Sequence, residues 1–506
     1  MELSLEQKSF AVCGEAANLA LRQPIETDLV LPDYCGDVKR ILHCCVQPNI
    51  HVVTAAGENI GAEGELVIRV LYVNESDQAD CMEQHIPLSV AGRVKALPVG
   101  AVLDVRAGME YINCRALSPR KISVSGTALV HIDVLEKKTE TYAAANEMLE
   151  TLTEEVSCAV LRALEQKTLD LSETLALGEE RPAVGRLLRA TGIPVLQSVE
   201  ATDDKLLIKG KLDVELLYLS GDGSLFRLTH TLPINQVITV PGATAGDDMD
   251  VSLTLRALYA EPKRDGNDEA KLIELAAKVS ALVKCSRTEV VTVVTDCYAT
   301  QGTLEPTFSE RAFPLRKSAP SLSRSFSETF ETGLDGNMTL LDSTVMQTHN
   351  TISGENGKVQ LKCSAVLSFL LQDTDGALQY IERTCELTAE EPLDWRADEV
   401  NCTPTVWLRL SQPMIDASGI IRLQIDLSAE GAVFVMQTER VLTDAVWLEA
   451  TDRDCQSLVL SFSKEGERLW DIAKRYRTKQ SLIQEENALQ GDVLTEDCML
   501  LIPCAG

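Results

Sequence analysis

Along most of the chain, apolar and polar residues alternate with a period of two, which is typical of antiparallel strands that bury one face. The clearest runs lie over residues 64–73 and 423–428, where Leu, Ile, Val and Tyr alternate with polar side chains. Gly221-Asp222-Gly223 and Asp375-Gly376 stand between runs of this kind and predict hairpin turns. The pattern therefore predicts a mainly β chain of antiparallel, sandwich-like sheets.

Two short segments depart from this alternation. Residues 33–44 and 179–190 each carry three apolar residues at helical spacing: Val38, Ile41 and Leu42 in the first, and Val184, Leu187 and Leu188 in the second. We therefore predict one short helix in each segment.

The sequence also repeats itself at long period, which indicates duplicated domains. The motif GELVIRVLYV at Gly64 returns as GKLDVELLYL at Gly210, an offset of 146 residues (210 − 64), and this offset aligns other apolar positions over about 75 residues. A fainter similarity aligns Lys358 with Lys205 at an offset of 153. We expect β-rich copies over residues 1–147 and 148–300 and a diverged third copy over 318–450.

Two stretches separate the expected domains. Residues 305–325 contain Pro306, Pro314 and Pro320 and predict either a linker or an irregular entry strand. A polar stretch, 449–457, precedes a last domain over residues 457–505.

This last domain has a pattern of its own. Short strands are predicted at its two ends, around residues 459–462 and 500–502, and a second short helix ends near Asn487. The first helix has one apolar face, formed by Leu469, Ile472, Ala473 and Tyr476. With Gly466 to Trp470 at its start, Asn487 after its second helix and a closing LLIP, the segment resembles a LysM domain. An unrelated small α/β tail is the alternative.

Resemblance to LysM implies a small βααβ recognition module that binds N-acetylglucosamine polymers or protein partners and catalyses no reaction. Its groove would lie between the loop 464–468 and the loop that starts at Asn487. Arg468 replaces the usual Thr, and Glu496-Asp497 replaces a Pro-Gly-Gln-like turn. An uncharged sugar would have to desolvate these charges, so a protein partner is favoured. The expected binding residues are Lys464, Gly466, Glu467, Arg468, Lys474, Arg475, Arg477 and Asn487.

Four of the residues in and after the first helix of this domain form a basic cluster: Lys474, Arg475, Arg477 and Lys479. The cluster is either a solvated outer helix face or a docking face for an acidic partner, whose approach it would steer.

A second resemblance concerns the repeats. The phrase LPDYCGDVKRIL over residues 31–42, followed by the motif at Gly64, is similar to the SPOCS domain of spore coat proteins. The second copy keeps the strand motif but has Gly178-Glu179-Glu180 in place of Pro-Asp-Tyr, and the third copy lacks the phrase. Tandem SPOCS domains followed by a LysM domain resemble the SipL-like family of spore coat morphogenetic proteins.

This family resemblance implies a non-enzymatic scaffold in the mother-cell cytoplasm, at the outer surface of the forespore. Its LysM domain would bind the coat-basement ATPase SpoIVA. The repeated domains would contact SpoIVA, other coat proteins or further copies of the chain.

Net charge, the absence of targeting segments and cysteine content limit the expected partners and the expected compartment. The net charge of −29, from 47 basic and 76 acidic residues, disfavours nucleic acid and anionic lipid, and its simplest role is solubility. Residues 1–10 contain no apolar block of a secretory signal, and no run approaches the roughly 18 apolar residues of a membrane span, so we expect the protein to stay where it is made. Fifteen cysteines without CxxC pairs suit a reducing cytosol.

Candidate chemistry is sparse. Cys35, His43, Cys44 and Cys45 form a cluster that is either a zinc site or a set of free thiols, and the adjacency of Cys44 and Cys45 favours thiols. The sequence has no P-loop, GxGxxG or GxSxG motif, and we expect no cofactor. Two alternatives to the scaffold stay open: a LysM protein that binds peptidoglycan or chitin in cell walls, and an enzyme whose carboxylates converge from separate strands in a deep pocket.

Overall fold

The structure of the protein, a computed structural model, describes residues 5–33, 35–317, 322–334, 337–355, 358–392, 400–402, 405–449 and 458–503. Most of these residues lie in strands, and two short helices lie near the C-terminal end. The predicted mainly β chain with antiparallel sheets is confirmed. No helix in the described ranges is long and apolar enough to cross a membrane. Tyr34, Pro320 and residues 450–457, which entered the predictions above, lie outside the described residues.

The first six strands form unit 1. They are β1 (Gln7–Val30), β2 (Val38–Ala56), β3 (Asn59–Asn74), β4 (Ala79–Arg93), β5 (Val102–Ser118) and β6 (Lys121–Ala143). Two sheets, with the strand orders β1-β6-β5 and β2-β3-β4, enclose one core of apolar side chains such as Leu66, Ile68 and Val130. The alternation read from the sequence thus places these residues on the inner faces of a sandwich.

The next six strands form unit 2 in the same arrangement. They are β7 (Glu150–Ala176), β8 (Val184–Thr202), β9 (Lys205–Ser220), β10 (Leu225–Thr239), β11 (Asp248–Lys263) and β12 (Leu272–Tyr298). Their sheets have the orders β11-β12-β7 and β10-β9-β8. Gly64 and Gly210 lie in the central strands β3 and β9. The predicted turn at residues 221–223 joins β9 to β10, with Gly223 at φ +84°.

Unit 3 consists of the remaining strands before the C-terminal segment. They are β13 (Thr303–Lys317), β14 (Leu322–Glu331), β15 (Met338–Glu355), β16 (Lys358–Asp373), β17 (Leu378–Pro392), β18 (Val400–Cys402), β19 (Thr405–Ile415), β20 (Ile420–Glu430) and β21 (Val433–Glu449). The sheets β14-β20-β19 and β15-β16-β17 enclose its core, and β13-β21-β18 is separate. β13 pairs with β21 along its length, with register shifts at Thr303/Leu304 and Thr307/Phe308, so of the two predictions for this segment residues 303–317 form an irregular strand and not a linker. The predicted turn at Gly376 joins β16 to β17.

The two predicted helices at 33–44 and 179–190 are wrong. After a turn, these segments enter strands β2 and β8, which carry register shifts at Val38/Arg40 and Ile41/His43, and at Val184/Arg186 and Leu187/Arg189. Each shift inserts one extra residue, so inward-facing residues follow one another at steps of three instead of two. Two bulges three residues apart therefore imitate the apolar spacing of a helix.

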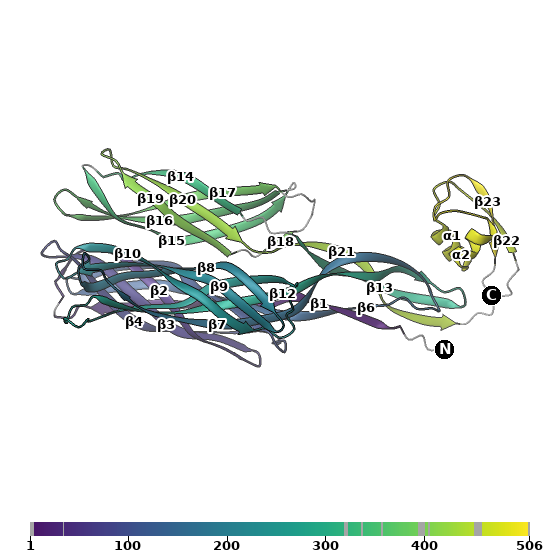
Figure 1. Cartoon of the computed structure of the whole chain (residues 1–506), viewed down its shortest axis with the longest axis horizontal. Coiled ribbons are helices and arrows are strands. Elements are labelled where there is room, and N and C mark those ends of the chain that lie inside the picture. The colour runs from purple at the N-terminus through teal and green to yellow at the C-terminus, as the bar shows by residue number, and fades with distance from the viewer. Residues whose placement is uncertain are drawn as a thin grey trace.

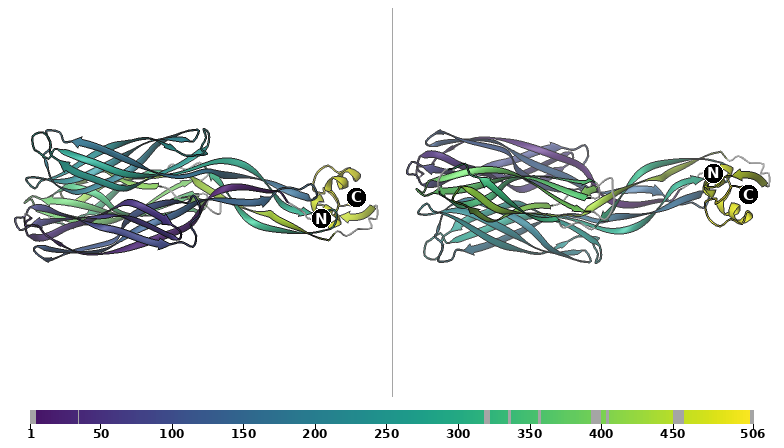
Figure 2. Two further views of the ribbon diagram at one scale, coloured as in Figure 1. Left: turned by 90° about the horizontal axis from the view of Figure 1, so that it is seen from below. Right: turned by 90° about the horizontal axis from the view of Figure 1, so that it is seen from above.

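Three two-stranded ribbons leave the three units and form a stalk (Figures 1 and 2). They are the outer ends of β1 with β6, β7 with β12, and β13 with β21. Their facing side chains make a separate apolar core that includes Phe10, Val156, Val293 and Phe313, and the rings of Phe10 and Phe313 stack with centroids 5.0 Å apart. This core joins all three units.

The last described segment, residues 458–503, is the C-terminal module. It consists of β22 (Leu458–Ser463), α1 (Leu469–Tyr476), α2 (Gln480–Glu486) and β23 (Cys498–Pro503). Figure 1 shows the module at the far end of the stalk, opposite the head in which the sandwiches of the three units lie side by side.

Candidate partner-binding module at the end of the stalk

The C-terminal module is organised by the apolar face of α1. Leu469, Ile472 and Ala473 are fully buried, as their spacing predicts, and cluster with Ile483 of α2 and Leu500 of β23. Tyr476 is half-buried, and its hydroxyl donates a hydrogen bond to Ser461 Oγ over 3.0 Å.

The two loops expected to border a groove are hydrogen-bonded to each other. The Gly466 N–H donates to the carbonyl of Leu494 over 2.8 Å, and the Leu494 N–H donates to the carbonyl of Glu467 over 3.0 Å. Arg468 forms an isolated bridge with Val493. Backbone groups of Gly466 and Glu467 are thus engaged within the module, whereas the side chains of Lys464 and Arg468 are exposed.

Asn487 holds the module together. Its side-chain amide donates to the carbonyls of Ile483 (2.8 Å) and Leu501 (2.7 Å), and its Oδ1 accepts from the N–H of Leu501 (2.7 Å). These bonds tie the end of α2 to β23, so the geometry gives this predicted binding residue a structural role.

The predicted basic cluster divides between two directions. Lys474, Arg477 and Lys479 face the stalk: Lys474 Nζ lies 2.6 Å from Asp296 Oδ1, Arg477 donates to the carbonyl of Gly302 over 2.9 Å, and Lys479 Nζ lies 3.7 Å from Glu150 Oε1. Arg475 is exposed. Three of the four side chains therefore contact the stalk of the same chain, two of them at carboxylates.

Asp296, at the end of β12, is the centre of this docking interface. Its carboxylate accepts hydrogen bonds from Lys474 and from Trp470 Nε1, the latter over 2.9 Å. Burial opposes ionisation of Asp296, but these two donors outweigh it, and the pKa of the carboxyl is lowered. The carboxylate thus stays charged and holds both side chains.

Tyr298 adds an apolar contact to the same interface. Its ring meets that of Trp470 edge-on, with centroids 4.9 Å apart, and its hydroxyl donates to the carbonyl of Thr478 over 2.8 Å. These contacts could not be predicted from the sequence, since Asp296 and Tyr298 lie more than 170 residues before Trp470 and Thr478.

The side of the module away from its helices is apolar and open. Leu460, Phe462 and Met499 are 65%, 64% and 64% exposed, and the register places Phe462 opposite Met499 and Leu460 opposite Leu501. We call these four residues the sheet face. In Figure 1, β22 and β23 lie on the side of the module that points away from the stalk.

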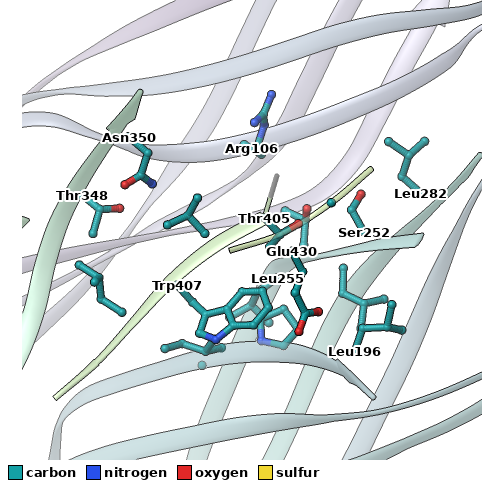
Figure 3. Close-up of a pocket in the computed structure, with 18 of the residues that line it drawn as sticks. Arg106, Leu196, Ser252, Leu255, Leu282, Thr348, Asn350, Thr405, Trp407 and Glu430 are labelled. Atoms are coloured by element: carbon teal, nitrogen blue, oxygen red, sulfur yellow. The ribbon is translucent and has the colours of Figure 1, made fainter. Parts of the chain in front are cut away.

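A second candidate site is a cavity of about 1070 Å³ between the three units (Figure 3). Its wall includes Arg106 of unit 1, Leu196 and Leu255 of unit 2, and Trp407 and Glu430 of unit 3. Carboxylates from separate strands converge there, as the enzyme alternative requires.

Three of these carboxylates are paired with guanidinium groups. Asp133 pairs with Arg106, Asp213 with Arg409, and Asp250 with Arg316, the last over 2.8 Å. Two other carboxyl groups, Asp104 and Glu430, have a pKa raised by burial. The pairs of Asp213 and Asp250 join unit 2 to unit 3, which is a structural role that the geometry supports directly.

The cysteine and histidine cluster does not converge. Cys44 packs in the core of unit 1, whereas the ring of His43 stacks on Tyr380 of unit 3 with centroids 4.4 Å apart. Cys35 accepts a hydrogen bond from Arg186 over 3.4 Å. No group of three or more possible metal ligands occurs in the part of the chain that the structure describes.

His43 predicts a pH dependence. Burial, and to a lesser extent Arg189, lower its pKa to about 4, although Asp342 acts in the opposite direction. Between about pH 6.5 and pH 4 the unfolded chain therefore binds a proton that the native chain does not, so stability falls as pH falls through this window. We expect His43→Gln to reduce the loss of unfolding free energy between pH 8 and pH 5 by about 2 kcal/mol. Urea titrations of the wild type and of His43→Gln at pH 8 and pH 5 measure the unfolding free energies. Equal losses in the two proteins would contradict the lowered pKa of His43.

Comparison with known protein families gives a match in the middle of the chain. Residues 183–262 match the family described as SipL, SPOCS domain. The matched segment runs from just before β8 to the end of β11 and so lies within unit 2, whereas the resemblance in the sequence is clearest in unit 1. No curated protein matches the chain. The family match supports a role related to sporulation.

Proposed function

We propose that the protein is a non-enzymatic scaffold of sporulation, placed in the mother-cell cytoplasm at the forespore surface, where it helps the spore coat to assemble. The observation that carries the proposal is the match of residues 183–262 to the SPOCS family. All three units belong to that domain type in this proposal, because unit 1 and unit 2 share strand order and unit 3 keeps both core sheets.

The C-terminal module acts as a LysM domain that binds protein, and its partner is the coat-basement ATPase SpoIVA. Support comes from the exposed sheet face at the end of the molecule and from the mutual hydrogen bonding of the loops that would border a glycan groove. Units 1 to 3 add weaker contacts with SpoIVA, other coat proteins or further copies of the chain, so that several contacts on one chain raise the effective concentration at the coat.

Binding to purified SpoIVA and to purified peptidoglycan tests this function. The full-length chain should be retained by immobilised SpoIVA and not by peptidoglycan, and a fluorescent fusion lacking residues 458–506 should fail to gather around the forespore. Retention by peptidoglycan alone would favour the cell-wall alternative.

A matched pair of variants locates the contact. Phe462→Ser removes an exposed ring of the sheet face and should weaken SpoIVA binding about tenfold or more, because burying such a side chain is worth about 1.5–3 kcal/mol. Glu485→Ser, an exposed change on α2, should bind as the wild type does. Equal affinities of the two variants would move the contact away from the sheet face.

A further inference from the structure

The three units meet around equivalent positions. Leu42, Leu188 and Leu341 are the extra residues of bulges in β2, β8 and β15, at offsets of 146 (188 − 42) and 153 (341 − 188). They gather in one apolar cluster that also contains a second triplet at the same offsets: Leu71, Leu217 and Leu370. Each unit thus contributes the same two strand positions to a common centre.

One kind of contact between units repeats three times around this centre. Strand β2 contacts β17 of unit 3, β8 contacts β4 of unit 1, and β15 contacts β10 of unit 2. Arg40 donates to Gln379 Oε1 of unit 3 over 3.0 Å, and Arg186, 146 residues later, lies 3.1 Å from Asp80 Oδ1 of unit 1. The units therefore form a closed ring of head-to-tail contacts with approximate threefold symmetry.

The residue after each bulge leucine breaks this symmetry. These positions are His43, Arg189 and Asp342, again at offsets of 146 and 153. Arg189 holds Asp342 through two hydrogen bonds, of 2.5 and 3.1 Å, and their side chains are only 9% and 4% exposed. The Nε2 atom of His43 is buried without a hydrogen-bond partner among the described residues, and its ring lies on Tyr380 of unit 3.

We propose that His43, Arg189 and Asp342 fix which unit lies beside which, so that a ring takes one unit of each kind and excludes a second unit 2 or a second unit 3 from another copy. Head-to-tail surfaces that are alike accept any neighbour and assemble without limit unless they close. A buried ion pair adds little net stability but excludes arrangements that leave either charge alone. Arg189 of unit 2 can pair with Asp342 of unit 3. A neighbour that placed a second Arg or a second Asp at this buried position would bring like charges together and is excluded.

Charge-exchange variants of the full-length chain test the proposal. Arg189→Asp and Asp342→Arg each place like charges together and should lower the melting temperature by about 10 °C or more. The double exchange should recover most of that loss. Failure of both single changes to alter the melting temperature would overturn the proposal.

A variant with two apolar residues in place of the ion pair distinguishes an effect on the order of the units from an effect on stability. Arg189→Met with Asp342→Leu should keep the melting temperature within a few degrees of the wild type. Two differently tagged copies of this variant, co-expressed, should co-purify at least several-fold more than two wild-type copies, because the order of units is no longer fixed. Co-purification at the wild-type level would show that the charges do not set the neighbours and would overturn the proposal.

Discussion

Replacing Trp470 with alanine is expected to release the C-terminal module from the stalk and to destabilise the module itself by about 3–5 kcal/mol. Trp470 is 6% exposed and belongs to the apolar cluster that joins α1 to Tyr298 of the stalk. The change removes both this packing and the hydrogen bond to Asp296. Hydrogen exchange of residues 458–503 in the full-length chain should become much faster.

A second variant separates docking from folding of the module. Asp296→Ala leaves the core of the module intact but removes the acceptor of Trp470 and Lys474. Hydrogen exchange should then rise over residues 470–478, which include the contacts of Trp470, Lys474 and Thr478 with the stalk, and stay slow in β23. If Trp470→Ala left exchange over residues 458–503 unchanged, the docked arrangement would be wrong.

Gly64→Ala should destabilise unit 1 by about 3 kcal/mol or more. A Cβ atom on Gly64 would lie 1.9 Å from the carbonyl oxygen of Asn49 in the neighbouring strand β2, next to the register shift at Ile50/Val52. Backbone atoms cannot turn away as a flexible side chain can, so β2 and β3 would have to separate. A lower midpoint of urea-induced unfolding, followed by circular dichroism, measures the effect.

The matched control is Gly108→Ala in β5, where an added Cβ would meet no heavy atom within 4 Å. This change should stay within about 1 kcal/mol of the wild type. Gly210→Ala, the equivalent change in unit 2, should resemble Gly64→Ala, because its Cβ would lie 2.5 Å from the carbonyl oxygen of Val195. Equal midpoints for Gly64→Ala and Gly108→Ala would contradict the steric explanation.

Alternation of apolar residues was enough to predict the antiparallel strands, because burial of one sheet face imposes a period of two, and the Asp-Gly sequences between the runs predicted the turns at Gly223 and Gly376. It failed at Val38 and Val184, where closely spaced bulges change that period to three. It also missed the stalk. In the stalk, β1 and β13 each bury one side chain in its core, Phe10 and Phe313, among residues that are half-buried or exposed, which gives little periodic signal in these two strands.

The candidate site was predictable only as far as it is local. Leu469, Ile472 and Ala473 reveal the apolar face of α1 through their spacing. The sequence could not show that Lys474 and Arg477 turn toward the stalk, because their partners Asp296 and Gly302 are brought near by folding of the whole chain. A basic cluster beside a binding motif therefore does not reveal whether its side chains contact another protein or another part of the same chain.

Strands β7 and β12 have 27 residues each and run from the core of unit 2 to the contacts with the module, a length of about 90 Å at roughly 3.3 Å per residue. A force applied to the docked module therefore acts along the axis of β12, whereas the hydrogen bonds between β12 and β7 are perpendicular to that axis. Such bonds share the load in shear and do not open one after another. This geometry suits a molecule that transmits tension along its long axis without stretching.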